Sequence, residues 1–128
     1  MRFVIVHQAD CNPSGMHYCV SADGHVEATL PANARGLHAQ CVDVALEGTF
    51  ESQPPAAAQM HALRALLVQL KLRYPDIRVG GHRQVRGART SCPGRAFPLR
   101  ELLAWSASGL LEARDAAIED IVNRAYGP

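Results

Sequence analysis

The chain has 128 residues, enough for one domain with a substantial core. Its net formal charge of +1 and its 48% hydrophobic content do not predict a strongly basic face, so we expect no nucleic-acid partner. No apolar run has the length of a membrane span, the N-terminus lacks a signal-peptide pattern, and the four cysteines form no CxxC pair.

The first third of the chain is typical of strands. Residues 2–7 are mostly β-branched or aromatic without a breaker, which predicts a buried central strand ending at His7. Residues 16–21 and 25–29 flank an Asp-Gly pair, which predicts a hairpin.

Residues 41–48 alternate with a period of two, which predicts a further strand. This alternation places Ala45 and Glu47 on the same face of that strand.

Helical periodicity begins after the Pro-Pro pair at positions 54 and 55 and ends before Pro75. A short strand is expected at 77–79, with two more helices at 98–105 and 110–126. In the last helix we expect four apolar side chains to point inward: Leu111, Ile118, Ile121 and Val122. The order of elements predicts a single α/β domain, with a mixed central sheet flanked by helices.

Candidate metal ligands occur in the Gly- and Arg-rich segment 79–99, where His82 and Cys92 lie ten positions apart. Imidazole and thiolate are ligands that zinc prefers, and His7 at the end of the first strand is the best third ligand. Three protein ligands with an open fourth position are typical of catalytic zinc. The alternative is a hydrogen-bonded core histidine beside a buried thiol.

Several motifs occur together in one order: His7, the HYxV strand, ANARG followed by VALEG, the Leu-rich helix, and GHRxV followed by CPGRAFPL. With these motifs the chain resembles the zinc-dependent N-acetylmuramoyl-L-alanine amidases of the peptidoglycan-recognition-protein and phage-lysozyme type. The resemblance runs from about residue 3 to residue 105. It implies an amidase-like domain at 1–106, without the family's N-terminal helix, and a C-terminal helical extension at 107–128 packed on the same domain.

The resemblance implies Zn²⁺ as the cofactor, with His7, His82 and Cys92 as its ligands. It also implies hydrolysis of the amide between the lactyl group of N-acetylmuramic acid and L-alanine, in peptidoglycan or in muropeptides. A zinc ion would supply this chemistry by lowering the pKa of water towards ~7 and by polarising the carbonyl.

The chain departs from its relatives at four positions that the resemblance associates with the reaction or its site. Met16 replaces a Tyr, Ala45 replaces a Glu, Thr90 replaces a Lys and Asn33 replaces a His. Glu47, one strand step beyond Ala45, is the best candidate to replace the missing acid/base group, and the alternative for it is a solvated strand end. Glu47 and Thr90 are therefore the candidate catalytic residues.

The resemblance suggests substrate contacts at five positions: His17, Asn33, Arg35, His38 and Arg83. For His38 the alternative is a solvated loop residue, and for Arg83 it is a brace within the loop. The resemblance also implies a shallow groove for the peptidoglycan stem, with zinc at its floor. The missing N-terminal helix would leave one wall of this groove open.

Three hypotheses follow from these observations. The first is an active amidase, the second a binding module that holds zinc and muropeptide without efficient hydrolysis, and the third a domain that uses zinc for fold stability. We expect peptidoglycan or muropeptide as the partner of a monomer. Synthesis in the cytoplasm is expected, with release or export to reach the cell wall.

Overall fold

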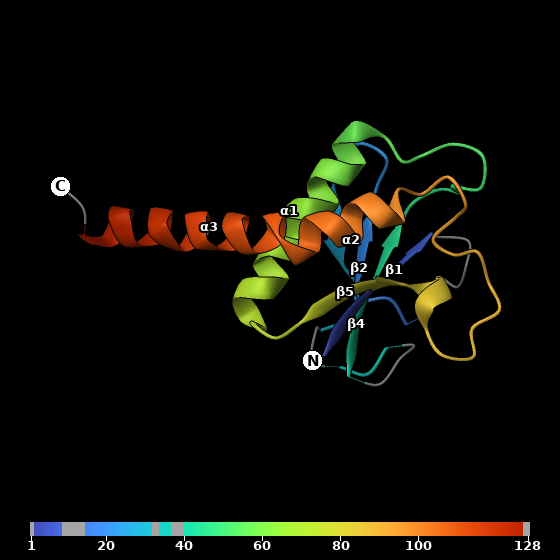
Figure 1. The fold of residues 1–128 in the computed structure, drawn as a ribbon, viewed down its shortest axis with the longest axis horizontal. Coiled ribbons are helices and arrows are strands. Elements are labelled where there is room, and N and C mark those ends of the chain that lie inside the picture. Colours follow the sequence, from blue (N-terminus) through green and yellow to red (C-terminus); the bar gives the residue numbers. More distant parts are fainter. Residues whose placement is uncertain (1, 9–14, 32–33, 37–39, 127–128) are drawn as a thin grey trace.

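The computed structural model describes residues 2–8, 15–31, 34–36 and 40–126 (Figure 1). Its elements, in chain order, are β1 (Phe3–Gln8), β2 (Tyr18–Val20), β3 (Val26–Ala28), β4 (Cys41–Leu46), α1 (Ala57–Arg73), β5 (Arg78–Gly81), the short 3-10 helix η1 (His82–Gln84), α2 (Leu99–Ala107) and α3 (Gly109–Tyr126).

The five strands form one mixed sheet in the order β3-β2-β4-β1-β5. Strand β1 runs parallel to both of its neighbours, β4 and β5, and β2 runs parallel to β4. Strands β2 and β3 form the antiparallel hairpin expected around the Asp-Gly pair, and Gly24 takes the positive φ of 90° that this turn requires. The prediction of a mixed sheet with a buried central first strand is confirmed.

One face of the sheet forms the main core against the helices. Its alternate apolar residues on β1 and β4 join a single buried cluster with α1 and α2: Val4, Val6, Val42, Val44 and Leu46. Side chains alternate across a strand, so the intervening residues of β1 and β4 face the opposite side of the sheet. All six residues of β4 are buried, which shows that both faces of this strand are covered.

Helix α1 has the apolar face that its sequence predicts. Its five periodic apolar side chains are all buried: Met60, Leu63, Leu66, Leu67 and Leu70. The helix ends at Arg73, and the N–H of Tyr74 donates to the carbonyl of Leu70 at 2.8 Å directly before Pro75. The end of the helix confirms the signal from Pro75. Pro54 and Pro55 precede the N-cap Ala56, so the expectation of a proline in the first turn is wrong.

Helix α3 contacts α1 and α2 and then extends away from the rest of the molecule (Figure 1). The prediction that Ile118, Ile121 and Val122 point inward is wrong, because these side chains are 43%, 57% and 46% exposed. A helix of 18 residues is about 27 Å long, so its last turns continue beyond the helices that support its first turns. The side chain of Leu111 lies outside the described residues.

Candidate metal centre

Three side chains from distant parts of the chain meet at one end of the sheet. A nitrogen of His7, a nitrogen of His82 and the Sγ atom of Cys92 all lie within 4.8 Å of one another. The closest described approach joins Cys92 Sγ and His7 Nδ1 at 3.9 Å. His7 and Cys92 are fully buried whereas His82 is half-buried, so the cluster is reached from the His82 side.

The parallel strands explain why these residues meet. Val6 of β1 pairs with Gly81, the last residue of β5, so His7 and His82, which follow them, lie at the same edge of the sheet. The carboxyl ends of parallel strands form the usual binding edge of an open α/β sheet. The two imidazole rings lie with their centroids 4.8 Å apart.

Cys92 reaches the site from the loop that follows η1. Its Sγ atom accepts the backbone N–H of Gln8 at 3.4 Å. The backbone N–H of Cys92 donates to Oγ1 of the exposed Thr90 at 3.1 Å. Thr90 therefore shapes the turn that presents the sulfur, and a part for it in the reaction stays a prediction.

Arg83 binds the backbone of the Cys92 loop. Its own N–H donates to the carbonyl of Cys92 at 2.8 Å, and its Nη1 donates to the carbonyls of Gly94 at 3.1 Å and Ser91 at 3.4 Å. These contacts support the alternative given above for Arg83, in which its side chain braces the loop. A substrate contact by Arg83 stays a prediction.

Glu51, which the sequence analysis did not single out, ties the same loop to the end of β1. Its carboxylate accepts the hydroxyl of Ser91, the N–H of Arg95 at 3.2 Å and the side-chain amide of Gln8 at 3.1 Å. The Ser91 hydrogen bond, followed by those from Arg95 and Gln8, lowers the pKa of the Glu51 carboxyl. Glu51 lies on a segment with no family motif and no periodicity, so the sequence offered no signal for it.

Asp43 is the second residue that the sequence analysis missed. Its Oδ1 lies 3.0 Å from Nε2 of His7, and both side chains are completely buried. The sequence did carry a signal, because an aspartate interrupts an otherwise apolar strand on the same face as Ala45. Metal-binding histidines usually donate their second N–H to such a carboxylate.

His17 lies behind Asp43 rather than on an exposed wall. Its Nδ1 accepts the backbone N–H of Asp43 at 2.9 Å, and its Nε2 lies 2.7 Å from the carbonyl of Ala34. The side chain is fully buried. Both ring nitrogens thus bind protein groups, which gives His17 a supporting place next to the site, and substrate contact by this ring stays a prediction.

The other predicted substrate contacts fall between β3 and β4 in the sequence. Arg35 is exposed, and substrate contact by its guanidinium stays a prediction. Asn33 and His38 lie outside the described residues.

Glu47 is exposed directly after β4, beside a small hollow of about 180 Å³ that Ala45 and Cys19 also line. Ala45 pairs with His7 across the strands, so the hollow continues the sheet face that carries the metal ligands. Met16 is buried. The structure thus places Glu47 one step beyond Ala45, as the alternation predicts, and leaves its catalytic part a prediction.

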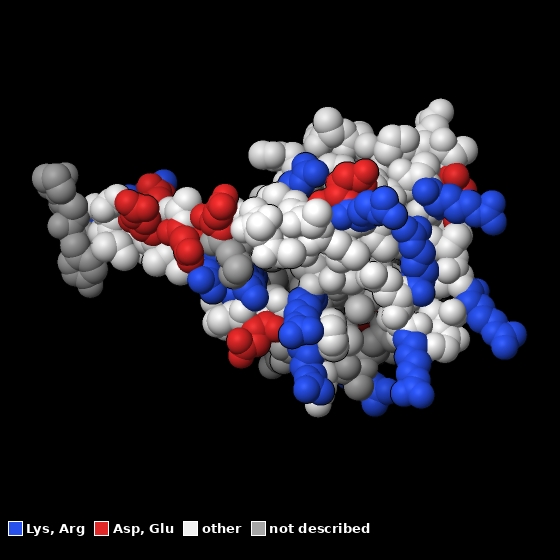
Figure 2. Space-filling view, in the orientation of Figure 1, with Lys and Arg blue, Asp and Glu red and all other residues white. Residues whose placement is uncertain are grey.

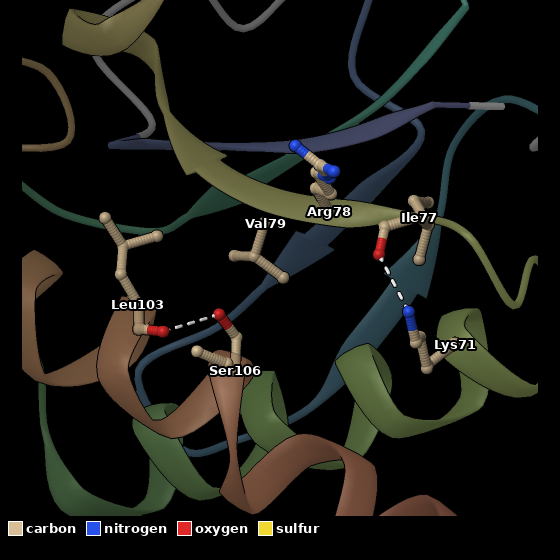
Figure 3. Close-up of a pocket in the computed structure, with 7 residues that line it drawn as sticks. Lys71, Ile77, Arg78, Val79, Leu103 and Ser106 are labelled. Atoms are coloured by element: carbon tan, nitrogen blue, oxygen red, sulfur yellow. Dashed lines mark hydrogen bonds between the residues drawn. The ribbon is translucent and has the colours of Figure 1, made fainter.

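A larger cavity of about 370 Å³ lies between β5, the end of α1 and the end of α2 (Figure 3). Lys71 and Ser106 line it, and their polar groups donate to the carbonyls of Ile77 at 3.2 Å and Leu103 at 2.8 Å. None of the described residues lining this cavity is a histidine, cysteine or carboxylate. The candidate metal ligands therefore lie outside this cavity, at the end of the sheet around His82.

The segment that holds His82 and Cys92 is strongly cationic. Between residues 77 and 100 the sequence has no Asp or Glu, and its six arginines are all exposed: Arg78, Arg83, Arg86, Arg89, Arg95 and Arg100. Figure 2 shows Lys and Arg side chains around the rounded part of the molecule, whereas acidic side chains gather on α3. The small net charge thus conceals a local positive field, which raises the concentration of anionic ligands near the site.

The comparison with known families decides the family of the chain. A sequence profile described as N-acetylmuramoyl-L-alanine amidase matches residues 2–95, which hold all three candidate ligands. The chain belongs to this amidase family. Members of the family commonly hold zinc, and a thiol with two imidazoles is a donor set that fits Zn²⁺.

Individual relatives agree with this assignment. The chain is 37% identical to an endolysin of Klebsiella phage KP32 over 89 residues, which cover 62% of this chain and 58% of the endolysin. It superimposes with a TM-score of 0.70 and 27% identity on the endolysin N-acetylmuramoyl-L-alanine amidase LysCS from Clostridium intestinale, covering 80% of this chain and 81% of that one. It thus spans less than two thirds of the phage endolysin's length.

The fold is also that of the peptidoglycan recognition proteins. Drosophila peptidoglycan recognition protein SA aligns with a TM-score of 0.67 at 18% identity, covering 82% of this chain and 79% of that one. Among the described residues, no helix is both long and apolar enough to span a membrane.

Proposed function

We propose that this chain is a zinc-dependent amidase that hydrolyses the bond between the lactyl group of N-acetylmuramic acid and L-alanine, in peptidoglycan or in muropeptides. The convergence of His7, His82 and Cys92 at one edge of the sheet carries this proposal. Two imidazoles and one thiolate leave the fourth position open, as catalytic zinc sites do. Family membership supplies the substrate class.

Zinc, when bound, supplies Lewis-acid chemistry, since it acidifies water and polarises a carbonyl. The chain itself holds the donors in place: Gln8 donates its N–H to the sulfur of Cys92, and Asp43 accepts from His7. Glu47 follows Ala45 on the same face and is the residue to which we assign transfer of a proton through water to the leaving amine. Its exposure keeps it in contact with that water.

The test is release of free stem peptide from purified peptidoglycan by the zinc-loaded protein. Cys92→Ala removes the thiolate and should abolish release, whereas Glu119→Gln, an exposed change on α3, should leave the rate unchanged. Glu47→Gln should lower kcat by about a hundredfold or more while zinc stays bound, because it removes the acid/base group and no ligand. Full activity in Cys92→Ala would contradict the proposal.

Thr90 is tested in the same assay. Thr90→Val removes the hydroxyl that accepts the N–H of Cys92 and should lower activity together with zinc affinity, as expected of a residue that shapes the loop. A fall in kcat with zinc affinity unchanged would instead give Thr90 a direct part in the reaction.

A second candidate function is a binding module that retains zinc and muropeptide without efficient hydrolysis. Ala45, the strand partner of His7, carries no acid/base group, and Met16 cannot donate a proton. For this function, one zinc per chain and muropeptide binding by calorimetry would be accompanied by no release of stem peptide. Substituting Ala45→Glu would then be the direct attempt to restore turnover.

A further inference from the structure

We infer that Asp43 selects Nδ1 of His7 as the metal-binding atom and holds the ring in that orientation. This inference rests on the proposed zinc centre and deepens it, because it assigns a positioning residue that lies outside the ligand set.

The geometry determines which ring nitrogen of His7 is available to a metal ion. Nε2 of His7 lies 3.0 Å from Oδ1 of Asp43, and Nδ1 of the same ring faces the sulfur of Cys92 at 3.9 Å. An ionised carboxylate can only accept a hydrogen bond, so the proton of a neutral His7 ring lies on Nε2. Nδ1 then presents its lone pair towards the other two ligands, which is the tautomer that metal binding requires.

Asp43 is itself held from behind. Its backbone N–H donates to Nδ1 of His17, so the neutral His17 ring carries its proton on Nε2, which donates to the carbonyl of Ala34. The side chains of Asp43 and His17 are both fully buried. Burial of a carboxylate costs several kcal/mol unless its partners compensate, so a residue needed only for packing at this place would more favourably be apolar.

Gly36 packs against this pair. A Cβ atom at Gly36 would overlap the carbonyl oxygen of Gly15 and lie 2.6 Å from Cε1 of His17 and 2.8 Å from Oδ2 of Asp43. The backbone therefore approaches both side chains as closely as only glycine allows. A side chain at this position would thus collide with Asp43 and His17, which gives a packing reason for the Gly of the ARG motif.

The first experiment measures zinc affinity by competition with a chromogenic chelator. Asp43→Ala should weaken zinc binding by about ten- to a hundredfold, the range found when such carboxylate partners of ligands are removed. Asp43→Asn should weaken it less, because its Oδ1 still accepts from Nε2 of His7. The exposed Asp76→Asn serves as the matched control and should leave the affinity unchanged.

The second experiment reads the bound nitrogen directly. In zinc-loaded protein with ¹⁵N-labelled histidine, long-range ¹H–¹⁵N spectra should show His7 bound through Nδ1 with its proton on Nε2. Asp43→Ala should broaden or divide this signal between the two nitrogens, whereas Asp43→Asn should keep it. A merely structural Asp43 would change the thermal unfolding temperature of the metal-free protein and leave the ligating nitrogen as it is.

The outcomes separate this inference from the proposed function. If the wild-type protein binds no zinc, both are overturned. If it binds zinc with His7 Nδ1 and both Asp43 variants match it in affinity and spectrum, only the inference is overturned. If Asp43→Ala fails to fold, the zinc affinity of Asp43→Asn decides instead. Ligation of zinc by Nε2 of His7 in the wild-type protein would overturn the inference. Zinc binding that depends on Asp43, without release of stem peptide, supports the inference and contradicts only the amidase.

Discussion

At Cys92, the sulfur and the backbone are held by different neighbours. Gln8 donates to the sulfur, while Arg83 donates to the loop carbonyls and Glu51 accepts from Ser91 and Arg95. These polar contacts add to the burial of Cys92 in fixing the position of its sulfur.

Arg83→Ala should lower the free energy of unfolding by about 1 kcal/mol and weaken zinc binding, because the carbonyls of Ser91 and Gly94 lose their guanidinium donor. Arg83→Lys should recover only part of the loss, since a lysine cannot present the forked guanidinium. Urea denaturation and chelator competition measure both effects. Arg100→Ala, an exposed arginine on α2, is the control, and an equal effect there would contradict the brace.

The pH dependence of stability should show the contribution of Glu51. Its pKa is lowered in the folded protein, chiefly by the hydrogen bond from Ser91, so its contribution is present above the ordinary glutamate range of about pH 4–5. The contribution should be lost as the pH falls through the lowered pKa. In Glu51→Gln the unfolding free energy should therefore fall less steeply between pH 5 and pH 3 than in the wild type. Parallel curves would contradict this assignment.

At the scale of elements, the sheet and α1 form the rigid support of the site. Two parallel neighbours hold β1 in place, so His7 has one position relative to Asp43 and His82. The same register places apolar side chains on the opposite face, where α1 covers them. The site and the core thus depend on the same strand alternation.

Leu67→Ala should destabilise the protein by about 2–5 kcal/mol, because this α1 side chain is 1% exposed and its loss leaves a cavity. Ile121→Ala on α3 should cost about 0.5 kcal/mol or less, since that side chain is 57% exposed. Chemical denaturation of the two variants provides the comparison. A large loss in Ile121→Ala would show that α3 is buried against a surface in solution.

Gly94→Ala should destabilise the Cys92 loop by about 2–4 kcal/mol. Gly94 has a φ of 119°, and an added Cβ would overlap the carbonyl group of Phe50, with its carbon at 2.6 Å. Gly87→Ala is a matched control, because its φ is 84° but nothing lies within 4 Å of the added atom. It should show only the backbone cost of about 1–2 kcal/mol. Equal unfolding temperatures for the two variants would contradict the packing argument.

Much of the fold could be predicted because it depends on local periodicity. The alternation of β4, the five-residue stripe of α1 and the Asp-Gly turn each lie within a short window of sequence. The candidate ligands could be singled out because imidazole and thiol side chains with family spacing are recognisable in the sequence. The partners of these ligands could not: Asp43 is 36 residues from His7 and Glu51 is 40 from Ser91, so only the folded chain brings them together.

The last helix shows the limit of periodicity. Its apolar residues have helical spacing, and the helix is present, yet Ile118, Ile121 and Val122 are exposed. An amphipathic pattern states that one face is apolar but does not state what covers it. The length of α3 relative to α1 and α2 decided the outcome.

At the scale of the whole molecule, a metal held by residues 7, 82 and 92 would link the first strand to the segment that follows the last strand. Zinc should therefore raise the unfolding temperature, since binding to the folded state alone adds about 4 kcal/mol at a thousandfold excess over Kd. Thermal unfolding with and without a chelator measures this. In Cys92→Ala the difference should shrink strongly, and an undiminished shift would place the zinc elsewhere.

The 85 residues that separate His7 from Cys92 also set an order of events during translation. His7 leaves the ribosome before Cys92, by roughly 4–17 s at 5–20 residues per second. Strand β1 has no neighbour until β4 emerges, and it lacks its second one until β5 does. The nascent polypeptide is thus unable to bring the three candidate metal ligands together until all five strands of the sheet have been synthesised.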